Sequence, residues 1–177
     1  MLDEFLTYYW QGSLDIIKIS NKRREIMIME GKIVNIEGFK AVGLTYFGDN
    51  NNGEIPNLWE AFNKRYNDIK HKSKPMLCYG ICDGEMDSEG RFHYTACVEV
   101  DSFENAPEDM ETKAVPGGKY VVYTYGGAIK DLGGFYNDIF SKWIPTSGYE
   151  MDYRPQLELY DERFMSNGEF DIYVPIK

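Results

Sequence analysis

Two stretches of this sequence repeat each other, and this internal repeat constrains the fold more than any other feature. Residues 38–48 read GFKAVGLTYFG, and residues 117–127 read GGKYVVYTYGG. Six aligned positions are identical: Gly38 and Gly117, Lys40 and Lys119, Val42 and Val121, Thr45 and Thr124, Tyr46 and Tyr125, and Gly48 and Gly127. Tyr-Asn-Asp-Ile also occurs twice, at 66–69 and 136–139. The repeat predicts two copies of one supersecondary unit packed together.

Each half shows the same order of predicted elements: strand, strand, helix, strand, strand. Alternating apolar residues and turn residues predict strands at 31–36, 40–47, 75–82, 91–100, 110–115, 119–126, 155–162 and 169–176. Apolar stripes at helical spacing predict helices at 56–70 and 131–144, the second ending at Pro145. We therefore predict an α+β fold of two units related by a pseudo-twofold axis, with two main helices on a mostly antiparallel sheet.

Within each half, the first two strands are separated by a short turn. The turn Glu37-Gly38 predicts a hairpin of the first pair, and Pro116-Gly117-Gly118 predicts a hairpin of the equivalent pair in the second half. The halves are expected at about 31–105 and 106–177 and form one domain, residues 31–177.

Residues 1–30 lie outside the repeat. Their apolar residues follow helical spacing and predict a short amphipathic helix: Leu2, Phe5, Leu6, Tyr9 and Trp10. Such a helix either packs on its own domain or serves as a linker or docking helix toward another domain or subunit.

Charge and cysteine usage narrow the function classes. The net charge is −10, from 19 basic and 29 acidic residues, which argues against direct contact with nucleic acid. Because a basic leader and long apolar runs are absent, we expect a cytoplasmic protein without a membrane anchor. Cys78, Cys82 and Cys97 lack CxxC spacing and are expected to be reduced thiols, so neither a metal nor another cofactor is predicted.

A carboxylate in the second half has no acidic equivalent in the first. When Pro75 is aligned with Pro155, Glu158 takes the position of Cys78. Strand alternation places Glu158 and Tyr160 on one face. Glu158 then either lines a cleft between the halves, at a cost in desolvation, or lies solvated on the outer face. Tyr173 in the last strand is the expected companion of Glu158 across the sheet.

Two late motifs, together with the duplicated plan, carry a family resemblance. Residues 154–160 (RPQLELY) and 170–176 (FDIYVPI) resemble GyrI-like effector-binding domains, over about residues 31–177. This family includes drug-sensing domains of AraC-type and MerR-type regulators as well as free-standing proteins. The resemblance implies a pocket for lipophilic, cationic or aromatic small molecules, with Glu158 at its centre. The aromatic residues expected around it are Trp59, Phe62, Tyr79, Tyr94, Tyr136 and Tyr173.

Three functions follow from this resemblance. The first is a ligand sensor, either free-standing or the effector domain of a regulator, with a DNA-binding domain or regulator as its partner in trans. The second is a GyrI-like hydrolase in which Glu158 is the base and Tyr173 assists. The third is a protein-interaction domain of the gyrase-inhibitor kind, acting through its acidic surface.

Overall fold

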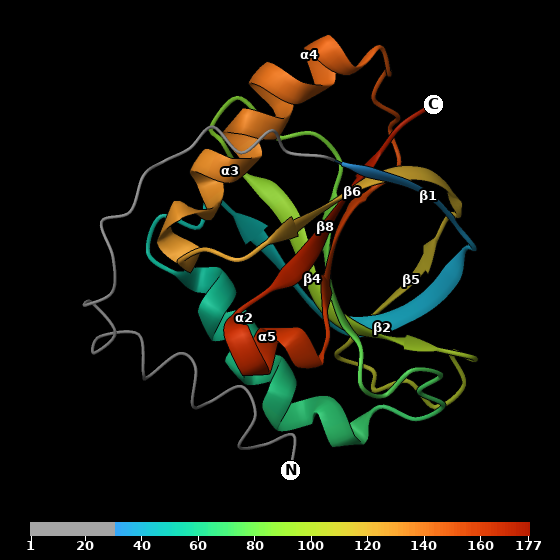
Figure 1. Ribbon diagram of the computed structural model, residues 1–177. Helices are drawn as coiled ribbons and strands as arrows, with labels where there is room; N and C mark the ends of the chain where they lie inside the picture. The colour runs from blue at the N-terminus through green and yellow to red at the C-terminus, as the bar shows by residue number, and fades with distance from the viewer. Residues whose placement is uncertain (1–30) are drawn as a thin grey trace.

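The strands of the described region, residues 31–177, join in one antiparallel sheet in the order β1-β6-β8-β7-β3-β4-β2-β5 (Figure 1). The computed structural model gives the strands as β1 (Lys32–Ile36), β2 (Phe39–Gly48), β3 (Cys78–Asp83), β4 (Phe92–Val100), β5 (Glu111–Val115), β6 (Gly118–Tyr125), β7 (Gln156–Tyr160) and β8 (Phe170–Pro175). The strands β1 to β4 of the first half are equivalent to β5 to β8 of the second. When each strand is replaced by its equivalent, the same order is obtained, read from the other end. The predicted α+β fold and pseudo-twofold plan are thus confirmed, with β3 and β7 adjacent at the centre.

The two predicted hairpins are wrong. Strand β1 pairs with β6 instead of β2, and β5 pairs with β2 instead of β6, so the halves exchange their edge strands. Because β2 and β6 carry nearly the same sequence pattern, local sequence does not distinguish one partner from the other. The exchange brings the two turns into contact, where a Cβ on Gly117 would lie 2.5 Å from the Gly38 amide nitrogen and 2.6 Å from the Ile36 carbonyl oxygen.

The contact between the two turns gives a first prediction. Gly117→Ala is expected to lower the free energy of unfolding by about 1–3 kcal/mol, because the added methyl group meets backbone atoms that cannot rotate away. Gly134→Ala is the matched control. It lies in a helix with no atom within 4 Å of the added Cβ, and is expected to raise stability by up to about 1 kcal/mol. Urea unfolding measures the free energy of unfolding of both variants. Equal effects of the two substitutions would contradict the close contact between the turns.

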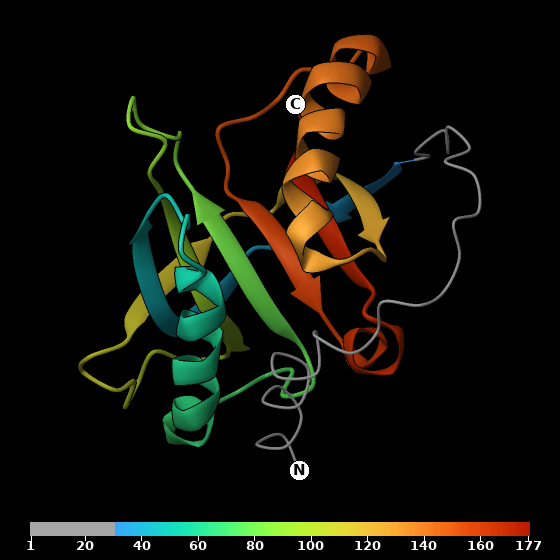
Figure 2. The same ribbon diagram turned by 90° about the vertical axis from the view of Figure 1, so that its left-hand side faces the viewer.

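The helices lie on one face of the sheet, with α2 and α3 on either side of the central strands (Figure 2). They are α2 (Glu54–Arg65), α3 (Leu132–Asp138), α4 (Ile144–Ser147) and α5 (Glu162–Asn167), with short 3-10 turns η2 (Tyr66–Asp68) and η3 (Ile129–Asp131) and the π-helical turn η4 (Ile139–Trp143). The predicted end at Pro145 is wrong. Helix α3 continues through η4 into α4, where Pro145 occupies the first turn and its missing N–H is not needed.

Helix α5 was not predicted from the sequence. It has six residues, which is too short to show a helical period. Asp161 caps it by accepting a hydrogen bond from the backbone N–H of Arg163. The amphipathic helix predicted within residues 1–30 lies outside the described residues.

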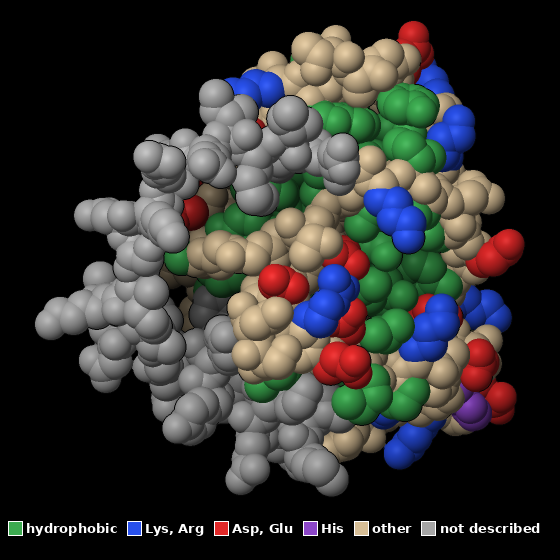
Figure 3. Space-filling view, in the orientation of Figure 1, with side chains coloured by type: hydrophobic (Ala, Val, Ile, Leu, Met, Phe, Trp, Pro, Cys, Tyr) green, Lys and Arg blue, Asp and Glu red, His purple; other side chains and the backbone are tan. Residues whose placement is uncertain are grey.

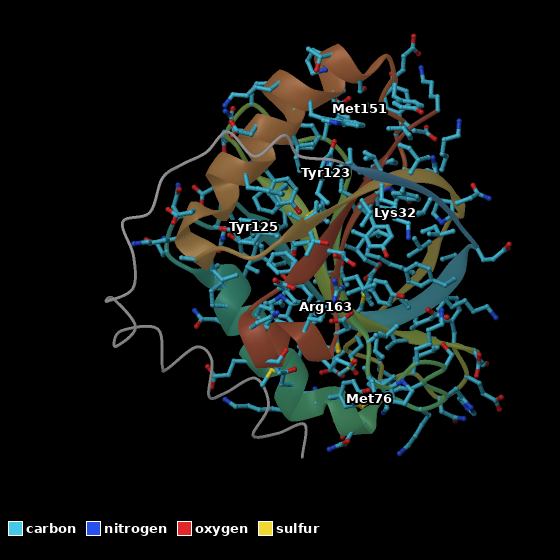
Figure 4. The ribbon with its side chains drawn as sticks, in the orientation of Figure 1. Lys32, Met76, Tyr123, Tyr125, Met151 and Arg163 are labelled. Atoms are coloured by element: carbon cyan, nitrogen blue, oxygen red, sulfur yellow. The ribbon has the colours of Figure 1, made fainter. Side chains whose placement is uncertain are left out.

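Apolar side chains pack on both faces of the sheet. Beneath α3, Tyr123 and Tyr125 point from β6 toward the helix and contact Phe135 (Figure 4). Beneath α2, the buried Phe62 packs between Trp59 and Tyr66. The opposite sheet face has its own buried cluster: Ala41, Tyr79, Ile81, Cys97, Val115, Tyr120 and Leu157. On the side where β1 and β2 lie, hydrophobic side chains remain visible at the surface between charged ones (Figure 3).

Within residues 31–177, no helix is both long and apolar enough to span a bilayer.

Candidate functional site

A cavity of about 510 Å³ lies on the helix-bearing face, lined by residues of both halves. Its floor comes from β3, β4 and β7 and carries Cys78, Cys82, Phe92, Tyr94, Glu158 and Tyr160. Its walls come from α2, η3, α3 and α5 and include Ile55, Trp59, Leu132, Tyr136, Phe164 and Met165. A concave, mostly apolar site with a few converging polar groups is the usual form of a small-molecule pocket.

The converging polar groups surround Glu158, whose side chain is buried with 4% exposure for the residue. Tyr136 donates its hydroxyl hydrogen bond to Oε1 at 2.9 Å. Tyr94 and Tyr160 donate theirs to Oε2 at 2.6 and 2.9 Å. Trp59 in turn donates from Nε1 to the Tyr94 hydroxyl oxygen at 3.0 Å. The solvated outer-face alternative for Glu158 is therefore wrong.

Glu158 has no cationic partner among residues 31–177, where the ion pairs of Lys and Arg involve other carboxylates. Burial raises the pKa of Glu158, while the three tyrosine hydrogen bonds act in the opposite direction. Burial, followed by the nearby Glu158 charge, raises the pKa of Tyr94 and of Tyr136 far above the usual value, so both remain neutral donors. The site is thus a buried acid held by neutral donors, which favours the arrival of a positive charge.

A glycine makes this arrangement possible. Gly80 on β3 lies directly opposite Glu158 on β7. A Cβ at Gly80 would lie 2.1 Å from the Tyr94 hydroxyl oxygen and 2.7 Å from Glu158 Oε2. Because Gly80 has no side chain, the Tyr94 hydroxyl and the Glu158 carboxylate can meet in the space that a side chain would fill.

Four of the residues expected from the sequence line the cavity: Trp59, Tyr94, Tyr136 and Glu158. Phe62 instead lies in the core beneath α2. Tyr79 lies in the cluster on the opposite sheet face, and Tyr173 packs against that cluster.

The expectation that Tyr173 accompanies Glu158 is wrong. Tyr173 pairs with Leu157, whereas Ile172 is the residue opposite Glu158. Alternation within one strand identifies which residues share a face, but it does not give the phase between two strands. Among the three donors to Glu158, the one missed is Tyr160, whose position two residues after Glu158 already put it on the same face.

Two further charged residues line the cavity, Lys130 and Asp161. Asp161 is already engaged by Arg163 on α5, and Arg163 also bridges to Asp171. In the described part of the chain, no group of three or more His, Cys, Asp or Glu side chains is placed to hold a metal ion.

Comparison with known proteins places this chain among effector-binding proteins. Residues 32–176 match the model of the Cass2 family, described as integron-associated effector binding protein. The chain is 35% identical over 152 residues to the transcriptional regulator BrlR of Pseudomonas aeruginosa. That alignment covers 84% of this chain and 56% of BrlR, so the chain spans little more than half of this relative.

Solved structures share the fold. An integron cassette protein of Vibrio cholerae superposes with a TM-score of 0.59 at 23% identity, covering 84% of this chain and 97% of the other. The structure of SAV2435 bound to tetraphenylphosphonium superposes with a TM-score of 0.61 at 18% identity, covering 84% and 94%. At these identities the likeness concerns the fold alone.

Proposed function

The chain belongs to the Cass2 family of integron-associated effector-binding proteins, and we propose that its cavity binds lipophilic cations with Glu158 as the counter-charge. One observation carries this proposal: Glu158 is buried in an aromatic cavity without a cation bound to it among the described residues. A buried carboxylate of this kind is costly to the fold and is compensated when a cation enters. The surrounding rings add hydrophobic area and negative π-faces.

The hydrogen bonds around Glu158 favour one kind of cation. Both carboxylate oxygens already accept tyrosine hydroxyls, and the Tyr94 oxygen accepts the Trp59 N–H. Asp161 is occupied by Arg163. A primary ammonium brings three N–H donors, for which the cavity side chains around Glu158 leave the second lone pair of Oε1 and the hydroxyl oxygens of Tyr136 and Tyr160. Each donor that stays buried without an acceptor costs about 1–3 kcal/mol. We therefore propose cations whose charged centre carries no hydrogen-bond donor, such as quaternary ammonium or phosphonium compounds.

Calorimetric titration tests this ligand class. Tetraphenylphosphonium, the ligand in the SAV2435 structure, is expected to bind with a Kd of about micromolar order. In a matched pair, (naphthylmethyl)trimethylammonium is expected to bind about tenfold or more tightly than naphthylmethylammonium of the same charge, since one unsatisfied donor suffices for that difference. Absence of saturable binding by any of these cations would reject the proposed function. Preference for the primary amine would reject the choice of cation class.

Tyr160→Phe gives a variant test with a control on the other sheet face. It frees a lone pair of Glu158 inside the cavity, so the primary amine is expected to gain affinity relative to the quaternary one. Tyr173→Phe removes a hydroxyl from outside the cavity and is expected to leave the ratio unchanged. Equal responses of the two variants would argue against the hydrogen-bond account.

In the cell, we propose that ligand binding is coupled to transcription in the cytoplasm. The similarity to BrlR supports this role, and a DNA-binding domain, in the same polypeptide or in trans, would be the partner. The hydrolase hypothesis loses its assistant residue, since Tyr173 and Glu158 lie on different sheet faces. The protein-interaction hypothesis stays a prediction from the acidic composition.

A further inference from the structure

Strand β3 brings two thiols to the wall of the cavity. Cys78 and Cys82 are free and line the cavity on either side of Gly80, the residue opposite Glu158. The third thiol, Cys97, belongs to the buried cluster of the opposite sheet face, where it donates to the Tyr79 carbonyl oxygen at 3.4 Å. Aromatic rings and a carboxylate suffice to hold a cation, so the two cavity thiols have no part in the function proposed above.

Cys78 and Cys82 each pair across the sheet with a donor to Glu158, Cys78 with Tyr160 and Cys82 with Tyr94. Cys82 is the more exposed of the two, half-buried where Cys78 is buried. Burial raises the pKa of Cys82 well above its usual value, and the Glu158 and Asp83 charges raise it further. Since the thiolate is the reactive form, the resting thiol is protected from neutral electrophiles.

A cation bound beside Glu158 removes the part of this protection that comes from the carboxylate, while the larger part that comes from burial remains. The charge of the cation offsets the carboxylate and stabilises a neighbouring thiolate. A ligand that combines a positive charge with a thiol-reactive group would thereby activate the nucleophile that it meets, whereas neutral and anionic reagents of the same reactivity would not.

We propose that Cys82 is a covalent acceptor for lipophilic cations that carry a thiol-reactive group. This inference rests on the proposed function, because the cation-binding cavity delivers the electrophile. In the step, the Cys82 sulfur forms a bond to the electrophilic atom, and the bond from that atom to its leaving group breaks. The leaving group departs with the bonding electron pair, and the thiol proton passes to Glu158 or to water. The cavity then retains its ligand covalently.

Cys78 provides an internal comparison on the same strand. Burial raises its pKa to about 12, and the charge that acts on it is that of Lys72, which lowers the pKa. Cys78 lines the same cavity, so the carboxylate draws a cationic reagent toward it as well, but Glu158 does not raise its pKa. The preference for cationic reagents is therefore expected to be smaller at Cys78 than at Cys82.

A pair of methanethiosulfonates tests the proposal on the reduced chain of 177 residues. One carries a trimethylammonium-ethyl group and the other a sulfonato-ethyl group; both form a mixed disulfide and release methanesulfinate. Rates are measured by intact mass and peptide mapping, and are divided by the rates with a small free thiol. Cys82 is expected to react at least about tenfold faster with the cationic reagent, because the carboxylate attracts one reagent and repels the other.

Variants separate this effect from simple accessibility. Glu158→Gln is expected to abolish the charge preference and to accelerate labelling by neutral methyl methanethiosulfonate, because the carboxylate no longer raises the pKa of Cys82. Cys82→Ser should remove the fast label, and Cys97→Ser should leave it intact. Tetraphenylphosphonium should slow the reaction by occupying the cavity.

Equal normalised rates for the two reagents at Cys82 would overturn the proposal. Labelling of Cys97 at the same rate as Cys82 would overturn it as well, because the cavity would then not select the thiol. If tetraphenylphosphonium binds but Cys82 shows no charge preference, only the covalent inference fails. If neither tetraphenylphosphonium nor the quaternary ammonium binds, the proposed function fails as well.

Discussion

Glu158→Gln is expected to weaken the binding of tetraphenylphosphonium by about 30-fold or more. Removing one partner of a buried charge pair costs roughly 2–5 kcal/mol, and about 1.4 kcal/mol corresponds to a tenfold change in Kd. Glutamine keeps the shape of the side chain in the cavity, so the loss reports the charge. Calorimetry on both proteins at pH 7 measures the change.

The same substitution is expected to raise the stability of the unliganded protein at pH 7. Because the folded-state pKa of Glu158 is raised, the folded protein binds this proton more tightly than the unfolded chain. The contribution of Glu158 to stability is therefore greatest at low pH. It falls as the pH rises through the interval from the usual value of 4.5 to the raised value. Glutamine stays neutral and avoids that loss.

Ligand binding is expected to show the opposite pH dependence. A permanent cation prefers the ionised carboxylate, so its affinity should rise with pH through the raised pKa of Glu158, above 4.5. Glu158→Gln should bind with the same affinity across this range. If Glu158→Gln bound the cation as tightly as the wild type, or if its affinity changed with pH in the same way, the carboxylate would not be the counter-charge.

The duplication made most of the fold predictable. Repeated residues around Gly38 and Gly117 identified two equivalent units, and alternation located the eight strands within a few residues. The exchange of β1 and β5 between the halves could not be predicted, because two equivalent edges compete for each strand and only the complete sheet distinguishes them. Short-range patterns do not contain that choice.

The site was predictable to the extent that it depends on one strand. Glu158 was singled out because its half carries an acid where the other carries Cys78, and Tyr160 lies on the same strand face. The prediction for Tyr173 was wrong because its placement depends on the register between β7 and β8, which the sequence pattern does not give. The role of Gly80 could not be predicted from the sequence. It depends on Tyr94 on β4 and Glu158 on β7, which come together only in the folded sheet.

Gly80→Ala is expected to disrupt both the fold and the site. The new methyl group would overlap the Tyr94 hydroxyl oxygen at 2.1 Å and the ring carbon Cζ at 2.6 Å. Tyr94 is fully buried and bonded to Trp59, so it has no free volume into which it can turn. We expect a loss of about 1–3 kcal/mol in the free energy of unfolding, as for other overpacked cores. Displacing Tyr94 also removes a donor from Glu158, so cation affinity should change in the same variant.

A double-mutant cycle with Tyr94→Phe isolates this contact. Phenylalanine lacks the hydroxyl oxygen closest to the new methyl group, so Gly80→Ala should cost less in the Tyr94→Phe background than in the wild type. Urea unfolding of the four proteins gives the coupling free energy, expected at about 0.5 kcal/mol or more, as for residues in direct contact. Strictly additive effects would show that Gly80 does not act through Tyr94. The position of Glu158 would then depend on its three tyrosine donors alone, and not on the space left by Gly80.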